Sequence, residues 1–306
     1  MEQRPIQRIK TISEFHRLRG FPPPEHPLIS IVDYSKIVHS EDIGETSWVL
    51  DFYQISMKRG MMTKFRYGQQ DYDFDEGIMF FMAPQQVFRI EAEKNPNTER
   101  SGWMLMIHPD FLWNTPLANM ISRYAFFDYS VNEALFLSEK EKEMLNAIVR
   151  TIEQEYRSLI DAFSKQIIVS QIETLLHYSE RFYHRQFITR EKSNHEIVGR
   201  LDAQLSAYFN SYDLISKGLP SVKSVAEELN VSPKYLSGLL KVLTGQSTQQ
   251  HIHDKLIEKA KEKLSTTSLS ISEIAYQLGF EHSQSFSKLF KSKTKQSPVE
   301  FRQGFN

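Results

Sequence analysis

Hydrophobic residues in the first third of the chain alternate with polar ones in short runs, which turn-forming residues separate. Such runs begin at Ile29, Trp48, Thr63, Gln70, Ile78, Val87 and Trp103. Short alternating runs bounded by Gly, Pro, Asp and Asn are typical of strands. Six or more of them between Leu28 and Leu112 favour an antiparallel barrel or sandwich. Residues 1–27 are polar and contain several prolines, which predicts an irregular N-terminal arm.

The period of the pattern then changes from two residues to nearly four. Ser138-Glu-Lys-Glu141 has the form of a capping box, and apolar residues follow it at helical spacing. A second helical stripe extends from about Asp161 to Tyr183. A stripe of this kind packs on the barrel or contacts its copy in a second subunit. We expect a homodimer formed through Ile168, Ile172, Leu175 and Leu176.

Residues 185–194 are polar and charged, which predicts a linker. They divide the chain into a sensor and dimerisation domain over residues 28–184 and a second domain over residues 195–306.

The second domain contains one pattern twice, about fifty residues apart. Val225-Ala226 with Leu229 matches Ile274-Ala275 with Leu278, and Leu236 with Leu240 matches Phe286 with Phe290. Asn230 and Gly279 stand where a tight turn needs a left-handed residue. Pro233 follows at the start of the next helix, where its missing N–H costs nothing. This is the pattern of a helix-turn-helix, whose second helix enters the major groove of DNA. Two copies predict double-stranded DNA as the partner.

The outer faces of the two second helices carry side chains that suit base edges. Gln pairs with adenine, Lys and His reach guanine acceptors, and Ser is less selective. The predicted base contacts are Lys234, Ser237, Gly238 and Lys241 in the first unit and His282, Ser283, Gln284, Ser285 and Lys288 in the second. Lys291 and Lys293 are predicted to contact phosphate. Because Gly238 offers no side chain, we expect the first unit to bind DNA less strongly than the second.

Between the two copies, Gln249 to Leu264 has apolar residues at helical spacing. A helix of this length spans roughly 20–25 Å. It would hold the two recognition helices about one DNA turn, roughly 34 Å, apart. One polypeptide would then read two successive major-groove segments. His251 and His253 do not share a helix face, so we interpret them as surface residues and expect no metal site.

Charge and composition fit this interpretation. The net charge of the whole chain is −1, but residues 190–306 hold 16 Lys and Arg against 12 Asp and Glu. A modest basic surface suits selective DNA binding better than indiscriminate coating of DNA. The chain has no cysteine, which excludes disulfides and thiolate catalysis. No apolar run is long enough for a signal peptide or a membrane span, so we expect a soluble, cytoplasmic protein.

The C-terminal hundred residues resemble the DNA-binding domain of the AraC/XylS family of transcriptional regulators. The residues that carry this resemblance are Ala226, Leu229, Ser232-Pro233, Tyr235-Leu236-Ser237, Thr244-Gly245, Ile271 to Ala275, Leu278-Gly279-Phe280, Phe286 to Lys291, Ser297-Pro298 and Phe301-Arg302. One departure is Lys295, where the family usually has Gly; this helix end must accept left-handed strain or close differently. The resemblance implies a cupin-like barrel that binds a small effector, helices for dimerisation, and activation through RNA polymerase.

The expected fold is multidomain α+β: an N-terminal antiparallel β-barrel of cupin-like form with two helices, then an all-α domain of two helix-turn-helix units joined by a linker helix. We expect an effector-responsive, sequence-specific transcription activator, with Tyr53, Arg66 and Trp103 as candidate effector contacts. One alternative is a constitutive DNA binder whose barrel only dimerises.

The rival from another class is a cupin-type enzyme. Metal-dependent cupins need a His-x-His pair with further ligands, whereas only His39 and His108 lie between Leu28 and Leu112. We therefore expect no catalytic residues and no cofactor.

Overall fold

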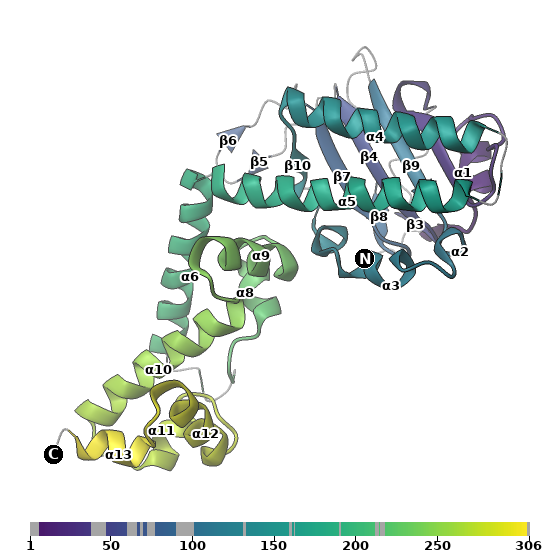
Figure 1. Cartoon of the computed structure of the whole chain (residues 1–306). Coiled ribbons are helices and arrows are strands. Elements are labelled where there is room, and N and C mark those ends of the chain that lie inside the picture. Colours follow the sequence, from purple (N-terminus) through teal and green to yellow (C-terminus); the bar gives the residue numbers. More distant parts are fainter. Residues whose placement is uncertain are drawn as a thin grey trace. The chain divides into compact units, whose positions relative to one another are not determined.

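A computed structural model describes residues 6–37, 47–59, 66–67, 70–71, 77–89, 101–130, 133–158, 161, 163–189, 191–211, 214 and 218–304. These residues form two compact units, an N-terminal unit up to Gln186 and a C-terminal unit from Phe187 (Figure 1). The boundary lies inside the helix α5 (Ser164–Thr189). Where the sequence predicts a linker over residues 185–194, the chain is helical up to Thr189, and α6 (Glu191–Asn210) then begins. Two of the polar residues there, Gln186 and Asn194, are buried and donate to the backbone carbonyls of Ala134 and Phe187.

The strands of the N-terminal unit form open sheets. A five-stranded antiparallel sheet has the order β10 (Leu135–Phe136), β7 (Ile78–Met82), β4 (Tyr53–Arg59), β9 (Ser101–Ile107) and β2 (Ile29–Asp33). A three-stranded sheet has the order β1 (Ile6–Ile9), β3 (Ser47–Leu50) and β8 (Val87–Arg89). The strands β5 (Arg66–Tyr67) and β6 (Gln70–Asp71) pair with each other.

The predicted antiparallel barrel is therefore not shown by the described strands. Among the described residues neither sheet closes on itself, and β1 pairs with β3 in parallel. The α+β class is confirmed. Alternation along a strand reveals which face is buried, but it does not show whether the last strand of a sheet bonds to the first.

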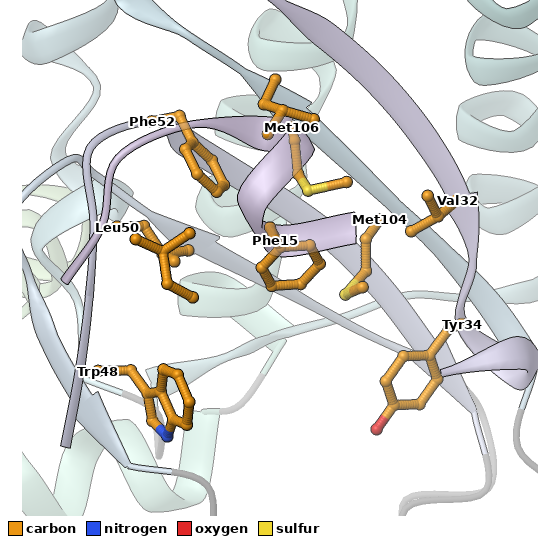
Figure 2. Packing of buried hydrophobic residues seen from close by; sticks show 10 residues of the cluster. Phe15, Val32, Tyr34, Trp48, Leu50, Phe52, Met104 and Met106 are labelled. Carbon is orange, nitrogen blue, oxygen red and sulfur yellow. The ribbon is translucent and has the colours of Figure 1, made fainter. Parts of the chain in front are cut away.

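The apolar cluster of this unit gathers side chains from both sheets (Figure 2). Trp48 and Leu50 come from β3, whereas Met104 and Met106 come from β9. Because side chains alternate along a strand, Trp103 and Leu105, which are next to these two methionines on β9, face the opposite side of the sheet.

The predicted irregular arm over residues 1–27 instead contributes to this cluster. It contains β1 and the helix α1 (Ile12–Leu18), which Thr11 caps by accepting from the Glu14 N–H. Ile12 and Phe15 of α1 are buried in the cluster. Ser13 and Arg17 lie on the solvent-exposed side of the helix, whereas the polar residues His16 and Arg19 are buried, which the sequence pattern did not indicate.

The other face of the five-stranded sheet meets two long helices, α4 (Glu139–Arg157) and α5 (Figure 1). The hydroxyl of Tyr156 on α4 donates to the Ile31 carbonyl of β2. The ring of Tyr183 on α5 lies 6.1 Å from that of Phe81 on β7. Both helices were predicted.

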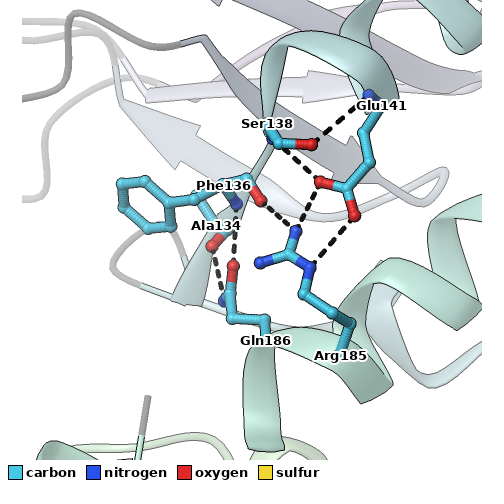
Figure 3. Close-up of polar contacts among 6 residues, drawn as sticks. All are labelled: Ala134, Phe136, Ser138, Glu141, Arg185 and Gln186. Atoms are coloured by element: carbon cyan, nitrogen blue, oxygen red, sulfur yellow. Dashed lines mark hydrogen bonds and ion pairs between the residues drawn. The ribbon is translucent and has the colours of Figure 1, made fainter. Parts of the chain in front are cut away.

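The start of α4 is fixed by the predicted capping box and by α5. Ser138 and Glu141 bond reciprocally to each other's backbone N–H groups. Arg185 of α5 then donates to Glu141 over 2.7 Å and to the Phe136 carbonyl over 2.7 Å. Gln186 bonds to the backbone of β10 at its side (Figure 3). These bonds join α4, α5 and the edge of the sheet.

All the described secondary-structure elements of the C-terminal unit are helices. Its elements are the end of α5, α6, α8 (Val222–Glu228), α9 (Pro233–Thr244), α10 (Thr248–Thr266), α11 (Ile271–Gln277), α12 (Ser283–Thr294) and α13 (Pro298–Gln303). The helix α10 contacts α6, α9, α11, α12 and α13, so it forms the centre of this unit. It is the predicted linker helix.

Candidate nucleic-acid interface

Two helix pairs of equal lengths lie in the C-terminal unit. The leading helices, α8 and α11, have seven residues each, and the second helices, α9 and α12, have twelve each. Both leading helices begin in a capping box, formed by Ser221 with Ser224 and by Ser270 with Glu273. The doubled sequence pattern therefore corresponds to a doubled structure.

The same hydrogen bonds close the turn in both pairs. The Val231 N–H donates to the Ala226 carbonyl over 3.0 Å, and the Phe280 N–H donates to the Ala275 carbonyl over 3.0 Å. These bonds fix the second helix against the first at a set angle, as major-groove recognition requires.

A left-handed residue allows each turn. It is Asn230 in the first pair, with φ 59°, and Gly279 in the second, with φ 86°. Asn tolerates this conformation better than most residues. Gly279 is constrained further, because a Cβ there would lie 2.9 Å from the backbone of Gly218. The two turn residues are where the sequence predicts them.

The second helices also end alike. Gly245 ends α9 with φ 74°, and Lys295 ends α12 with φ 67°. Each donates its N–H to a carbonyl four residues earlier, of Lys241 and Lys291 respectively. Of the two possibilities for Lys295, the chain therefore adopts the left-handed conformation that usually belongs to glycine.

Aromatic packing orients α12. The rings of Phe280 and Phe286 lie 5.5 Å apart, those of Phe286 and Phe290 5.8 Å, and those of Phe290 and Phe301 5.5 Å. Leu236 and Leu240 are the buried counterparts on α9. Because these faces point inward, the opposite faces of both helices are directed to solvent.

On α9 the outward face is only partly as predicted. Lys234 and Lys241 are exposed, whereas Ser237 and Gly238 are half-buried. Ser237 shares a hydrogen bond of 3.0 Å with Thr248, the buried first residue of α10. This bond joins the recognition helix to the central helix.

On α12 the outward face is polar and open. His282, Gln284, Ser285 and Lys288 are exposed, and Ser283 is half-buried. His282 occupies the N-cap position without a side-chain cap bond, whereas Ser232 caps α9 by accepting from the Tyr235 N–H. A helix start without a side-chain cap suits a phosphate group of DNA, because its first N–H groups are free to donate.

The two predicted phosphate contacts lie at the end of α12. Lys291 and Lys293 are both exposed. Lys293 donates to Asp254 of α10 over 2.7 Å. Asp254 also accepts from Gln246. Its carboxylate therefore pairs with one of the two lysines predicted to contact phosphate, a bond the sequence did not reveal.

The two histidines of α10 have separate local partners. His251 bonds to Thr244 over 2.9 Å, and His253 bonds to Gln249 over 2.8 Å. Partial burial lowers the pKa of both rings. Across the part of the chain that the structure describes, no three His, Asp or Glu side chains are grouped to hold a metal ion.

The helix α6, which contacts α10, was not predicted from the sequence. Its buried residues Ile197, Leu201, Leu205 and Phe209 recur every four positions, a helical signal that was present in the sequence. The hydroxyl of Tyr208 on α6 donates to the Gly218 carbonyl over 3.1 Å. Through these contacts α6 supports the loop that lies against Gly279.

Two of the candidate effector residues, Tyr53 and Trp103, have separate partners. Tyr53 packs edge-on against Phe127, with 5.1 Å between the rings, and burial and then the charge of Asp128 raise its pKa. Trp103 is buried and donates to Asn146 of α4 over 2.8 Å. Both lie on the side of the sheet that faces helices, not between the sheets. Arg66 lies in β5, and its side chain is outside the described residues, as is His39.

Trp103 borders an open groove of about 530 Å³ between α4, β2 and residues 21–25. Arg150 and Tyr156 of α4 also line it. Arg157 at its edge is paired with Glu153 over 2.8 Å. The groove holds charges of both signs and therefore favours no particular ligand class.

The four residues assigned to a dimer interface are buried in the single chain. Ile168 is 3% exposed, and Ile172, Leu175 and Leu176 are fully buried. This is a correction: a side chain already covered by its own chain offers no surface to a second copy. Phe163 and Ile167 on the same helix are exposed. The helical stripe was read correctly, but its period does not tell which partner covers it.

Sequence comparison adds an independent observation on the C-terminal segment. A family model described as a helix-turn-helix domain matches residues 225–304. The uncharacterized HTH-type transcriptional regulator YfiF of Bacillus subtilis is 24% identical over 243 residues, which cover 77% of this chain and 71% of that protein.

Two further relatives match about a third of this chain or less. The arabinose operon regulatory protein of Salmonella typhimurium is 39% identical over 83 residues, which are 27% of this chain and 30% of that protein. The solved C-terminal domain of AraT, a response regulator from Geobacillus stearothermophilus, is 36% identical. The match covers 35% of this chain and 84% of that domain, with a TM-score of 0.31. The chain thus spans less than a third of the arabinose regulator.

Proposed function

We propose that residues 225–304 form an AraC-type helix-turn-helix domain and that the chain is a sequence-specific transcription regulator that reads two successive major-groove segments. The observation that supports the proposal is the pair of matching helix-turn-helix units on one central helix. The helix α10 has 19 residues and is therefore about 28 Å long. This length suits recognition helices spaced by one turn of DNA, roughly 34 Å.

The proposed base contacts are the exposed polar side chains of the two recognition helices. Gln284 and Lys288 on α12 have hydrogen-bonding groups that match adenine and guanine edges. Lys234 and Lys241 have the same role on α9. Ser237, Gly238 and Ser283 are half-buried and contribute less, whereas His282 and Ser285 flank the contacts on α12. Lys291 and Lys293 are assigned to phosphate.

Selection from random duplex DNA by the full chain tests this proposal. The expected result is one enriched sequence with two conserved segments separated by one helical turn. Replacing Gln284 and Lys288 by Ala should weaken binding to that sequence by about tenfold or more without changing the melting temperature. The matched control is Lys223→Ala, which removes an exposed lysine of α8 outside the recognition helices. Failure to enrich any sequence would refute sequence-specific binding.

We also propose that the N-terminal unit binds a small effector that changes the affinity of the protein for DNA. The fusion of a sheet-bearing unit to the DNA-binding unit, together with the resemblance stated above, supports this. The proposed partner in activation is RNA polymerase, and the place of action is the cytoplasm. Transcription in vitro from a promoter that carries the selected sequence would give the sign of regulation. A protein that binds DNA identically under all ligand conditions would instead be the constitutive binder.

Self-association remains part of the proposal, although the four residues first assigned to it are core residues. Sedimentation of the full chain measures it directly. With regard to membranes, none of the described helices is both long enough and apolar enough to span a bilayer.

A further inference from the structure

Two cationic side chains, one buried and one half-buried, lie next to the apolar cluster between the two sheets of the N-terminal unit. Arg19, at the end of α1, is only 1% exposed. Lys58 of β4 is in register with Gly102 of β9 and Ile78 of β7. Because side chains alternate along a strand, Lys58 lies on the same sheet face as Ser56, two residues earlier. No described carboxylate pairs with either cation.

Aromatic rings, and not counterions, surround the two cations. The guanidinium of Arg19 lies 5.2 Å from the Trp48 ring and 5.9 Å from the Phe15 ring. The ammonium of Lys58 lies 4.8 Å from the Tyr34 ring and 5.4 Å from the Phe80 ring. Such contacts recover only part of the solvation that a cation loses on burial.

Buried donors without partners occur beside these cations. They are the Nε of Arg19, the indole Nε1 of Trp48 and the hydroxyl of Ser56. Trp48 is 4% exposed and Ser56 is fully buried. In Figure 2 the indole nitrogen of Trp48 and the hydroxyl of Tyr34 lie at the edge of the cluster away from Phe52 and Met106. The cluster therefore has one apolar end and one end that carries hydrogen-bonding groups.

The side chains of Arg19, Lys58, Trp48 and Ser56 can all donate hydrogen bonds. Guanidinium, ammonium and indole groups can only donate hydrogen bonds, and a Ser hydroxyl can donate as well. Buried donors of this kind are normally satisfied, so the set lacks an acceptor. Two positive charges near each other also favour an acceptor that is negative. A neutral sugar or amide would leave the two charges uncompensated.

We propose that this region binds a small organic carboxylate, whose oxygens accept hydrogen bonds from Arg19, Lys58, Trp48 and Ser56 and whose body lies against Phe15, Tyr34 and Phe80. The proposal deepens the effector response proposed above by naming the chemical class of the effector. Binding itself depends only on residues of the N-terminal unit. A carboxylate at this place would join α1 to β3 and β4, elements that come from distant parts of the sequence.

Thermal denaturation and titration calorimetry of the full chain, without DNA, test the proposal. The probes are formate, acetate, benzoate and hexanoate at up to about 10 mM, with benzamide and hexanamide as neutral counterparts. Formate tests the hydrogen-bond donors of the site alone, because it has no carbon chain or ring to pack against the aromatic side chains. At least one carboxylate should bind and raise the melting temperature, and the amides should do neither. A panel without binding, or amides that bind as well as carboxylates, would overturn the proposal.

Substitutions separate binding from folding. Arg19→Met and Lys58→Met should each weaken carboxylate binding by about 30-fold or more, because a buried charge partner is lost. Without ligand, both variants should be at least as stable as the parent, since an unpaired buried charge is replaced by an apolar chain of similar size. Arg17→Met, which removes an exposed cation of the same helix, should leave binding unchanged. Undiminished carboxylate binding in the Arg19 and Lys58 variants would refute the site.

The same measurements distinguish a missing carboxylate site from a missing effector response and from missing DNA binding. Carboxylate binding that leaves the affinity for selected DNA unchanged would refute the effector response and keep the site. Selective DNA binding that none of the carboxylates alters, together with an absence of calorimetric heat, would refute the site and keep the DNA-binding function.

Discussion

Lys293, at the end of the second recognition helix, donates to Asp254 of the central helix α10 over 2.7 Å. Both side chains are partly exposed. The bond couples a lysine assigned to DNA phosphate with an acidic group on the helix that carries both recognition units. If Lys293 contacts phosphate as proposed, Asp254 opposes DNA binding in two ways, by occupying Lys293 and by adding a negative charge near the DNA backbone.

Asp254→Asn is expected to tighten DNA binding by about two- to fivefold at low salt, because an exposed charge of this kind contributes up to about 1 kcal/mol. The slope of log affinity against log salt should steepen by up to about one unit as Lys293 becomes free for phosphate. Filter binding between 50 and 200 mM salt measures both quantities. Glu258→Gln is the control, since Glu258 lies one turn further along α10 and pairs with Lys255. Weaker binding in Asp254→Asn would mean that Asp254 positions α12.

The left-handed residues that end α12 and α9 lead us to expect opposite changes in stability when Lys and Gly are exchanged at these two positions. Lys295→Gly should stabilise the protein by about 0.5–1 kcal/mol, because the relief of left-handed strain exceeds the entropy that glycine adds to the unfolded chain. Gly245→Lys at the matching end of α9 should destabilise it by a similar amount. Urea unfolding of the two variants provides the comparison. Equal and opposite shifts are expected, and destabilisation by Lys295→Gly would show that its side chain contributes contacts.

Because the apolar stripe of α5 is buried, a charged substitution in it should unfold the chain and not dissociate a dimer. Ile168→Asp places a carboxylate in the core and should cost more than about 3 kcal/mol. Ile167→Asp, at the exposed neighbouring position, should cost less than about 1 kcal/mol. Circular dichroism reports the loss of fold, and sedimentation reports the mass. A folded Ile168→Asp protein that has changed from dimer to monomer would restore the original assignment of this stripe to a dimer interface.

Because of Lys58, we expect the free energy of unfolding to increase in alkaline solution. Burial, and next the charge of Arg19, lower its pKa to about 8 in the folded chain. Between about pH 8 and the higher pKa of an exposed lysine, the unfolded chain binds more protons, so the free energy of unfolding increases with pH. The increase should be about 1–3 kcal/mol at most.

Lys58→Met should remove this alkaline rise. Tyrosines, which titrate above pH 10, are common to the parent and the variant, so the difference between their pH profiles isolates Lys58. Chemical denaturation from pH 7 to 9.5 is the measurement. Parallel profiles for the two proteins would show that Lys58 is solvated in the folded state.

Local signals in the sequence located several elements of both units well. The turn positions Asn230 and Gly279 follow from backbone sterics, and the capping box at Ser138 follows from neighbouring residues. Each of these features depends on residues a few positions apart. The same is true of Ile197 to Phe209 on α6, which was missed although its period was present.

Features that depend on distant residues were not predictable in this way. The parallel pairing of β1 with β3 joins Ile6 to Ser47, and no local pattern encodes which strand is the neighbour. The bond from Lys293 to Asp254 spans 39 positions. Burial of Ile172 by its own chain and burial by a second subunit give the same apolar period. The sequence therefore predicted elements better than it predicted their partners.

Hydroxyl-radical footprinting of the full chain on its selected DNA tests the central claim most directly. The account predicts two protected segments one helical turn apart on one face of the duplex. Gln284→Ala with Lys288→Ala should remove protection from one segment, and Lys234→Ala with Lys241→Ala from the other. A single protected segment that only the α12 variant abolishes would contradict reading by two units. In that case α9 would be a supporting helix and not a second reader.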